Sequence, residues 1–256
     1  MLKKFSCIVL IIFCLLISGC NNNVKSINSR EDLSNAKIGV YTGSEYDIIL
    51  KNNIKSATTA YYNSYSDEIS ALKSGKIDAF LTDEPLAKEI LRNNEGLKIL
   101  DEKMTIDSYA FAINPQKTTL KEEVDEIILE MKNDGTLTKL EEKWFGDIEE
   151  KKELEKYDYK YTDTIKFATV SGSAPFAYMK NNRIVGYDID VINYIGYKLG
   201  YKIEIVEMAF EGMITALVSG KVDIAGCSII VTEERKKVVL FSEPNYTGGI
   251  VLVTRQ

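Results

Sequence analysis

The sequence predicts an α/β protein with two lobes, each built around a mainly parallel β-sheet. A ten-residue segment occurs twice, at 69–78 and 214–223, with seven identical residues. In each copy an amphipathic helical pattern ends at Ser-Gly, where glycine suits a left-handed C-cap, and a short apolar strand follows. Such strand and helix patterns alternate along most of the chain, which favours α/β units. The 256 residues, 45% of them hydrophobic, suffice for two lobes and exclude a disordered chain.

The first copy of the repeat lies in a half of the chain that runs from 36 to 146. Its helices are expected to begin at capping signals, namely Ser44, Ser66 and the Asp-Glu-Pro run at 83–85. The elements expected in this half are strand 37–42, helix 44–53, strand 58–62, helix 66–74, strand 77–82, helix 83–93, strands 97–100 and 109–113, and helices 118–131 and 136–145.

The second copy lies in a half that runs from 164 to 256, and a charged stretch at 147–163 joins the two halves. We interpret this stretch as a solvated linker. The elements expected in the second half are strand 165–169, a hairpin over 177–186, helix 188–199, strand 202–206, helix 211–219, strand 222–225, a helical turn capped by Thr232, and strand 250–254.

The first twenty residues have the pattern of an export signal. Two lysines precede an apolar run at 5–17, which is shorter than the roughly 20 residues that a spanning helix needs. The run ends in Ile-Ser-Gly-Cys, which resembles the bacterial lipobox. We therefore expect residues 1–19 to be a lipoprotein signal peptide, Cys20 to be lipidated (palmitate is a typical acyl chain), and 20–35 to be a flexible tether. The protein would then sit on the extracytoplasmic face of the cell membrane, held by its lipid anchor.

Composition excludes several kinds of function. A net charge of −6 argues against nucleic acid as a partner, because binding to phosphates depends on Lys and Arg. The absence of histidine removes the commonest general base, the Ser-His-Asp arrangement and His-ligated zinc. With Cys20 acylated, Cys227 has no partner for an intramolecular disulfide in the mature chain. We therefore expect no catalytic residues, no metal and no cofactor.

A set of ordered motifs resembles one known family. In the second half these are Pro-Phe-Ala-Tyr at 175–178, Gly-Tyr-Asp-Ile-Asp-Val at 186–191, Thr-Glu-Glu-Arg at 232–235 and Phe-Ser-Glu-Pro-Asn-Tyr at 241–246. In the first half they are Gly-Val-Tyr-Thr-Gly-Ser at 39–44, Asp-Ala-Phe-Leu-Thr-Asp-Glu-Pro at 78–85, Asp-Gly-Thr at 134–136 and Lys-Trp-Phe-Gly at 143–146.

Together they resemble the bacterial extracellular solute-binding proteins of family 3, which bind polar amino acids for ABC transporters. The resemblance implies the type-2 periplasmic-binding-protein fold, a two-lobed "Venus flytrap", and it covers nearly all of residues 36–256.

The two halves stand in the reverse of the family's usual order. Residues 164–256 match the family's N-terminal half, and residues 36–146 match its C-terminal half. The chain is either a circular permutant whose halves pack as one unit, or a fragment of a longer protein. In the permutant, the linker at 147–163 is expected to replace one of the two connections between the lobes.

The residue chemistry of the motifs points to an amino-acid site. Arg235 offers a planar fork for a carboxylate and matches the family's carboxylate-binding arginine. The amides of Ser44 and Glu45, after Gly43, begin a helix and are suited to an anion. Asp83 ends a strand, where open α/β sheets place ligands, and is the candidate for the ammonium group. Ser228, Thr232 and Phe210 are expected to face the cleft by resemblance.

Four positions depart from the family's pattern. Val170 stands where many members carry an acid, and Ser173 where an aromatic side chain commonly stacks on the ligand. Ile230 replaces a hydroxyl residue, and Tyr41 replaces a Gln or Lys. Ser173 and Tyr41 remain candidates for ligand contact, although these changes make the site less polar.

The favoured function is a lipid-anchored solute-binding component of an ABC transporter. It would bind a small polar solute, an amino acid by resemblance, between two closing lobes and deliver it to a membrane permease. One alternative is a sensor or scaffold protein with a degenerate pocket. Another is an enzyme on the same fold that acts through a carboxylate such as Asp83 or Glu45.

Overall fold

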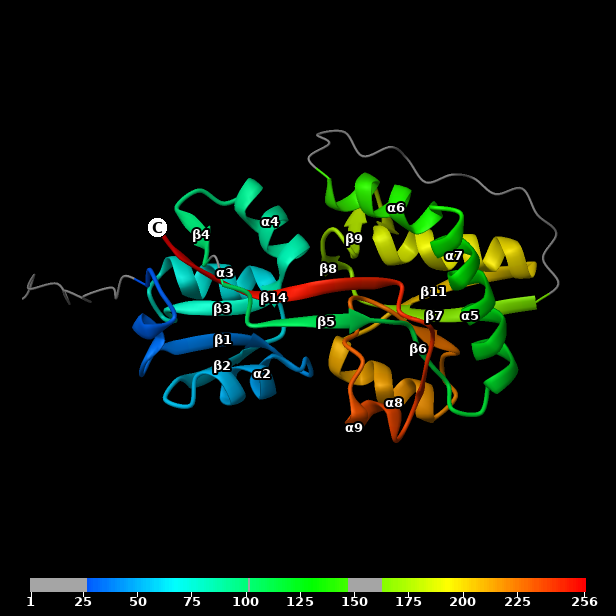
Figure 1. Cartoon of the computed structure of the whole chain (residues 1–256), viewed down its shortest axis with the longest axis horizontal. Helices are drawn as coiled ribbons and strands as arrows, with labels where there is room; N and C mark the ends of the chain where they lie inside the picture. Colours follow the sequence, from blue (N-terminus) through cyan, green and yellow to red (C-terminus); the bar gives the residue numbers. More distant parts are fainter. Residues whose placement is uncertain (1–26, 101, 147–162) are drawn as a thin grey trace, which may run out of the picture.

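The computed structural model describes residues 27–100, 102–146 and 163–256. The expected signal peptide, Cys20, residues 20–26 of the expected tether and nearly all of the linker lie outside these residues. Residues 27–35 of the expected tether instead belong to the first lobe, because Ile27 and Leu33 are fully buried in its core. The described chain forms two lobes that lie side by side along the long axis (Figure 1).

The first lobe contains a six-stranded sheet of order β2-β1-β3-β14-β4, with β5 also paired to β14. Its strands are β1 (Lys37–Tyr41), β2 (Thr58–Tyr62), β3 (Ala79–Asp83), β4 (Leu97–Ile99), β5 (Thr105–Tyr109) and β14 (Tyr246–Arg255). Its helices are the 3₁₀ turn η1 (Glu31–Leu33), α2 (Tyr46–Asn53), α3 (Tyr65–Lys73) and α4 (Glu84–Arg92).

The second lobe contains a five-stranded sheet of order β11-β7-β12-β6-β13 and a small sheet of order β10-β9-β8. Its strands are β6 (Ala112–Ile113), β7 (Asp163–Thr169), β8 (Gly172–Ser173), β9 (Ala177–Lys180), β10 (Arg183–Val185), β11 (Tyr201–Glu207), β12 (Ile224–Ala225) and β13 (Leu240–Phe241). Its helices are α5 (Thr118–Asn133), α6 (Thr136–Phe145), α7 (Tyr187–Leu199), the 3₁₀ turn η2 (Phe210–Gly212), α8 (Met213–Val218) and α9 (Glu233–Lys236).

Two chain segments cross between the lobes, and they run antiparallel to each other. β5 belongs to the first sheet and leads directly into β6 of the second sheet, whereas β13 of the second sheet leads into β14 of the first. β5 and β14 pair with Tyr246 opposite Tyr109, and they lie together across the middle of Figure 1. The expectation that the linker replaces a connection between lobes was therefore wrong, because the chain on either side of it, α6 and β7, belongs to the second lobe.

The prediction of mainly parallel sheets was also wrong, because both sheets are mixed. β1 pairs in parallel with β2 and β3, and β7 pairs in parallel with β11 and β12. The antiparallel pairs of these two sheets all involve β14 or β6, the strands that arrive from the other half of the sequence. Each half thus supplies the parallel strands of one lobe and a crossing strand to the other.

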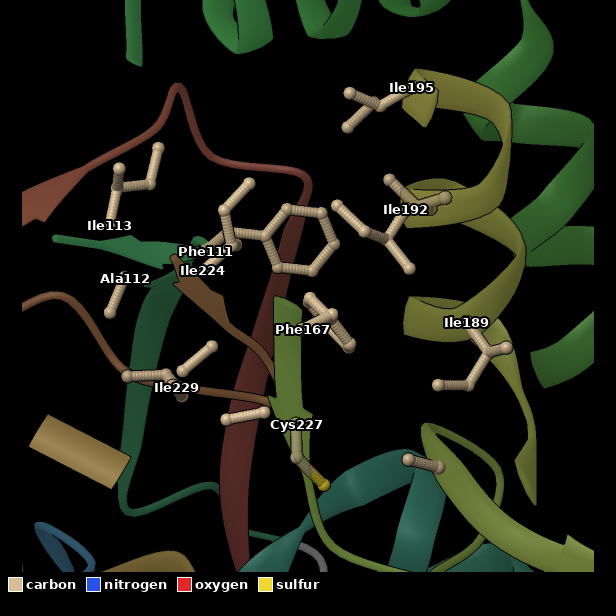
Figure 2. Close-up of a cluster of buried hydrophobic side chains, with 14 of the residues drawn as sticks. Phe111, Ala112, Ile113, Phe167, Ile189, Ile192, Ile195, Ile224, Cys227 and Ile229 are labelled. Atoms are coloured by element: carbon tan, nitrogen blue, oxygen red, sulfur yellow. The ribbon is translucent and has the colours of Figure 1, made fainter. Parts of the chain in front are cut away.

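Buried side chains fill each lobe separately. The core of the second lobe is built around Phe111, Phe167 and Ile192, with β6, β7 and α7 meeting in Figure 2. Phe111 and Phe167 pack edge to face with ring centroids 5.3 Å apart, a favourable geometry for aromatic rings. In the first lobe one cluster contains Ile38 and Leu252, and another contains Leu72.

Some local details differ from those that the sequence predicts. Ser64, not Ser66, caps α3, since its hydroxyl accepts a hydrogen bond from the amide of Asp67 at 3.1 Å. The single strand expected over 109–113 is divided between β5 and β6 at the crossing between sheets. The helix expected over 211–219 begins as the η2 turn, with Phe210 at its start.

In the part of the chain that the structure describes, no helix combines the length and apolar character needed to cross a membrane. The same residues contain no group of three or more His, Cys, Asp or Glu side chains arranged to hold a metal ion.

Candidate functional site

A pocket lies where the two lobes meet, with an empty volume of about 330 Å³ that includes open solvent at its mouth. The first lobe contributes the end of β1, the loop after it and the starts of α2 and α3, and the second contributes β8 and the segment from η2 to α9. The lining residues are Tyr41, Ser44, Glu45, Tyr46, Tyr65, Ser173, Phe210, Cys227, Ser228, Ile230 and Arg235.

Arg235 is the cation of this pocket, and α9 presents it from the second lobe. Thr232 caps α9 by accepting a hydrogen bond from the Arg235 amide at 3.2 Å, as its position before two glutamates predicts. The guanidinium donates to the carbonyl of Ile230 at 2.9 Å and reaches across the cleft to the carbonyl of Gly43 at 3.1 Å. Burial lowers the pKa of Arg235, and the carboxylate of Glu45 counteracts this effect.

Glu45 forms an ion pair with Arg235 from the opposite lobe, with Oε1 3.2 Å from Nε. The guanidinium carbon of Arg235 also lies 5.9 Å from the centre of the Phe210 ring, within cation–π range. Arg235 therefore contacts protein groups of both lobes. A carboxylate, a carbonyl oxygen and an aromatic face together form an environment suited to a guanidinium.

Asp83 lies at the carboxyl end of β3, as expected, but it does not line the pocket. Its carboxylate accepts hydrogen bonds from the hydroxyl of Tyr109 at 2.7 Å and from that of Ser228, in the second lobe, at 2.8 Å. Its side chain makes no capping bond to α4. Burial raises the pKa of Asp83 to about 6, although the bonds from Tyr109 and Ser228 act in the opposite direction.

Ser228 joins two carboxylates. While its hydroxyl donates to Asp83, its amide donates to Asp188 at the start of α7 at 2.9 Å. Ser228 has a φ of +47°, a value unusual for serine, and this turn directs both donors at acids. Burial raises the pKa of Asp188 to about 7. The second residue of the Tyr-Asp-Ile-Asp motif is thus a structural partner of the pocket loop.

Aromatic rings from both lobes form one wall of the pocket. Tyr41 stacks on Tyr65 with centroids 4.8 Å apart, and it meets Phe210 edge to face at 6.1 Å. Tyr41 therefore places an aromatic surface at a position where the resemblance implies a polar side chain.

Gly43 brings the first lobe against the second. Its φ is +82°, and a Cβ atom at this position would lie only 2.8 Å from the backbone of Glu211. No larger residue fits this loop without displacing the second lobe.

Six of the nine predicted ligand-binding residues line the pocket: Arg235, Ser228, Ser44, Phe210, Tyr41 and Ser173. Gly43 is linked to the pocket because its carbonyl accepts a bond from Arg235, whereas Asp83 and Thr232 do not line the pocket. Of the departures from the family's pattern, Ile230 lines the pocket, and Val170 is buried without lining it.

Tyr46, Tyr65 and Cys227 line the pocket without having been predicted. Glu45, which was expected to offer its amide to an anion or its carboxylate to an enzyme reaction, lines the pocket as well. Sequence proximity could have indicated two of the missed residues, because Tyr46 follows Glu45, and Cys227 precedes Ser228. Cys227 is a buried free thiol at the edge of the second core, and burial raises its pKa (Figure 2). Nothing in the local sequence indicates that Tyr65 reaches the pocket.

The sequence profile of the bacterial extracellular solute-binding proteins, family 3, matches residues 34–147 and 165–256. The chain belongs to this family. The two matched segments together include every pocket residue, and the interval between them, 148–164, covers nearly all of the charged linker. The family consists of solute-binding proteins of transport systems.

Curated relatives match parts of the chain. The L-cystine-binding protein TcyJ of Escherichia coli K12 is 31% identical over 125 residues, which are 48% of this chain and 47% of the relative. The arginine-binding extracellular protein ArtP of Bacillus subtilis is 39% identical over 82 residues, 32% of each chain. The probable histidine-binding protein of Campylobacter jejuni is 38% identical over 85 residues, 33% of each chain. The chain thus matches half or less of the length of these relatives.

Among solved structures, the ligand-binding component of an ABC-type import system from Staphylococcus aureus is similar over 86% of this chain and 65% of that one, with a TM-score of 0.46 and 16% identity. Domain 1 of an arginine-bound protein, TmArgBP, is 32% identical over 36% of this chain and 80% of that domain, with a TM-score of 0.32.

Proposed function

We propose that this protein is the solute-binding component of an ABC importer and that it binds an amino acid between its lobes. The observation that carries the proposal is the position of Arg235 in the pocket where the lobes meet. A guanidinium there can pair with a carboxylate through two parallel hydrogen bonds. Family membership supports the solute-binding role, and the cystine- and arginine-binding relatives support an amino acid as the solute.

The remaining groups of the pocket are suited to the rest of an amino acid. The aromatic faces of Tyr41, Tyr65 and Phe210 can pack on its side chain or on a cationic group. The hydroxyl oxygens of Ser173 and Ser228 also line the pocket, and that of Ser228, which donates its proton to Asp83, can accept a bond from an ammonium group. Asp83 lies behind Ser228 and accepts a hydrogen bond from its hydroxyl. Its carboxylate thereby orients this hydroxyl and adds negative charge near the ammonium group of the solute.

We further propose that Cys20 is lipidated and holds the protein at the extracytoplasmic face of the membrane, where it delivers its solute to a permease. The Ile-Ser-Gly-Cys run at 17–20 after a basic and apolar leader supports this proposal. Radiolabelled palmitate supplied to cells that express the protein should label the wild type and not Cys20→Ala. Equal labelling of both would reject the anchor.

We also propose that the two halves form one binding unit in permuted order. Two features support this: the pairing of β5 with β14, and the exchange of strands β6 and β14 between the lobes. The alternative, a fragment of a longer protein, predicts that the chain alone unfolds without a single cooperative transition.

A sensor or scaffold role is the second candidate, and one observation favours it. The groups expected to hold the solute, Arg235 and Asp83, already bond to groups of the opposite lobe. A catalytic role for Asp83 has less support, because its carboxylate is 1% exposed and accepts bonds from two hydroxyls.

A thermal-shift screen of the standard amino acids and L-cystine tests the proposal. A true ligand at about 100 times its Kd should stabilise the fold by about 2.7 kcal/mol and raise the melting temperature. If no amino acid raises the melting temperature at millimolar concentration, the importer proposal is wrong and the sensor or scaffold role is favoured.

A further inference from the structure

The carboxylate that pairs with Arg235 belongs to the protein itself and comes from the opposite lobe. Glu45 Oε1 lies 3.2 Å from Arg235 Nε, and the two side chains are only 17% and 10% exposed. The guanidinium also donates to the carbonyl of Gly43 across the cleft. The contact that joins the lobes at this point therefore needs no solute.

The loop that carries Glu45 is fixed in place. The hydroxyl of Ser44 donates to the carbonyl of Tyr41 at 2.6 Å, and Gly43 packs so closely on Glu211 that a Cβ would not fit. Glu45 follows directly and is the N-cap residue of α2, although its side chain makes no capping bond to this helix. The carboxylate is directed at Arg235 instead.

The geometry of this ion pair allows a carboxylate with two hydrogen bonds to the guanidinium to displace Glu45. A carboxylate that uses both oxygens on two guanidinium nitrogens forms parallel bonds and gains more than a single contact. Oε1 of Glu45 pairs with Nε, while the two terminal nitrogens of Arg235 donate to the carbonyls of Ile230 and Gly43. A free carboxylate that enters the pocket requires the same cation, so the two compete.

We propose that Glu45 is an internal carboxylate that occupies the anion-binding position of Arg235, holds the two lobes together, and selects for solutes whose own carboxylate displaces it. The first two parts concern the protein alone. The selection of solutes rests on the function proposed above.

The first two parts can be tested without knowing the solute. The full mature chain is compared as wild type, Glu45→Ala, Glu45→Ala with Arg235→Ala, and Glu234→Ala, which removes an exposed acid of α9 as a matched control. Small-angle scattering should give a larger radius of gyration for Glu45→Ala than for the wild type or Glu234→Ala. Sodium acetate, at about 50 mM and compared with an equal concentration of sodium chloride, should raise the melting temperature of Glu45→Ala by binding to the native state.

Acetate should leave the wild type and the double variant unchanged relative to chloride. An unchanged radius together with no acetate response in Glu45→Ala would overturn the proposal, and so would an equal response in the double variant. If Glu45→Ala does not fold, Glu45→Gln keeps the size of the side chain and removes its charge, and it is judged by the same two measurements.

The selection of solutes is tested with L-arginine and agmatine, which differ by the carboxylate alone. An internal competitor lowers the fraction of protein in which Arg235 is free to bind a solute. Glu45→Gln should therefore bind L-arginine about tenfold more tightly than the wild type does, whereas the two proteins should bind agmatine equally well. An equal gain for both compounds would contradict competition. If neither compound binds either protein, the importer proposal fails for this solute, while the acetate experiment still decides whether Glu45 joins the lobes.

Discussion

The indole N–H of Trp144 donates a hydrogen bond to Oδ2 of Asp190 at 2.7 Å. Trp144 comes from α6 in the first half of the sequence, and Asp190 from α7 in the second. Lys143 adds a second contact to the same oxygen at 2.8 Å. Trp144 and Asp190 are 46 positions apart in the sequence. Their bond therefore joins the Lys-Trp-Phe-Gly motif of the first half to the Gly-Tyr-Asp-Ile-Asp-Val motif of the second, within one lobe.

Removal of this contact should destabilise the protein. Asp190→Ala leaves the buried Trp144 indole and Lys143 without this acceptor, so we expect the free energy of unfolding to fall by about 2–4 kcal/mol. Urea unfolding followed by circular dichroism measures the change. Glu142→Gln, an exposed change in the same helix, should stay within about 0.5 kcal/mol. A similar small effect of Asp190→Ala would show that the bond does not stabilise the lobe.

The buried acids behind the pocket should make the protein less stable as the pH rises. Burial raises the pKa of Asp188 to about 7 and that of Asp83 to about 6, whereas an unfolded aspartate titrates near 3.9. Between about pH 4 and 7 the folded state binds more protons than the unfolded state. The contribution of these two acids to the free energy of unfolding is therefore full below about pH 4 and is lost as the pH rises through about 6 to 7.

Asp188→Asn removes one of these titrations. The loss of unfolding free energy between about pH 4 and 8 should be smaller in this variant by on the order of 3 kcal/mol. Urea titrations at each pH measure it, with Glu234→Gln as an exposed control. Identical pH profiles for wild type and Asp188→Asn would mean that this carboxyl titrates normally.

Glu68 is a buried acid without a hydrogen-bond partner for either carboxyl oxygen. It lies on α3 beside Gly39, and burial raises its pKa well above the ordinary range. Glu68→Met fills a similar volume without an unsatisfied polar group, and it should raise the free energy of unfolding by about 1–3 kcal/mol. Chemical unfolding at neutral pH measures the gain. A loss of stability instead would show that the carboxyl has a structural role.

The order of the halves can be tested by restoring the usual one. Asn28 accepts a bond from Lys98 at 2.6 Å, and Gln256 donates to the carbonyl of Leu97 at 3.2 Å, so both lie beside β4. A chain that joins residue 256 to residue 28 through roughly six Gly and Ser residues, and that begins and ends within 147–162, should fold as the same unit. The unfolding midpoint and the solute affinity of this rearranged chain should match those of the wild-type chain. A chain that fails to fold cooperatively would contradict a permuted single unit.

Local signals in the sequence predict most of the elements, as the two Ser-Gly ends of the repeat illustrate, because these signals concern residues within a few positions of one another. The position of Asp83 at the end of β3 is predicted in this way. Arg235 is singled out by the resemblance of the Thr-Glu-Glu-Arg motif to the family, not by its local sequence, and the structure places it in the pocket lining.

Contacts between distant segments are not predictable in this way. The side chain of Asp83 meets Ser228, 145 positions away, and the guanidinium of Arg235 reaches Gly43 across 192 positions. The division of segment 109–113 between β5 and β6 likewise depends on which sheet each part joins. Ser64 was missed because two serines flank the start of α3, and only the backbone decides which of them caps it.

Isothermal titration of the amino acid found by the thermal screen tests the central claim, that Arg235 binds the solute's carboxylate. Arg235→Ala should weaken binding by at least about 100-fold, in line with the loss of a buried charge-assisted pair. Lys237→Ala, which removes an exposed lysine paired with Glu234, should change the affinity less than about twofold. Equal effects of the two substitutions, or full affinity in Arg235→Ala, would contradict the site described here.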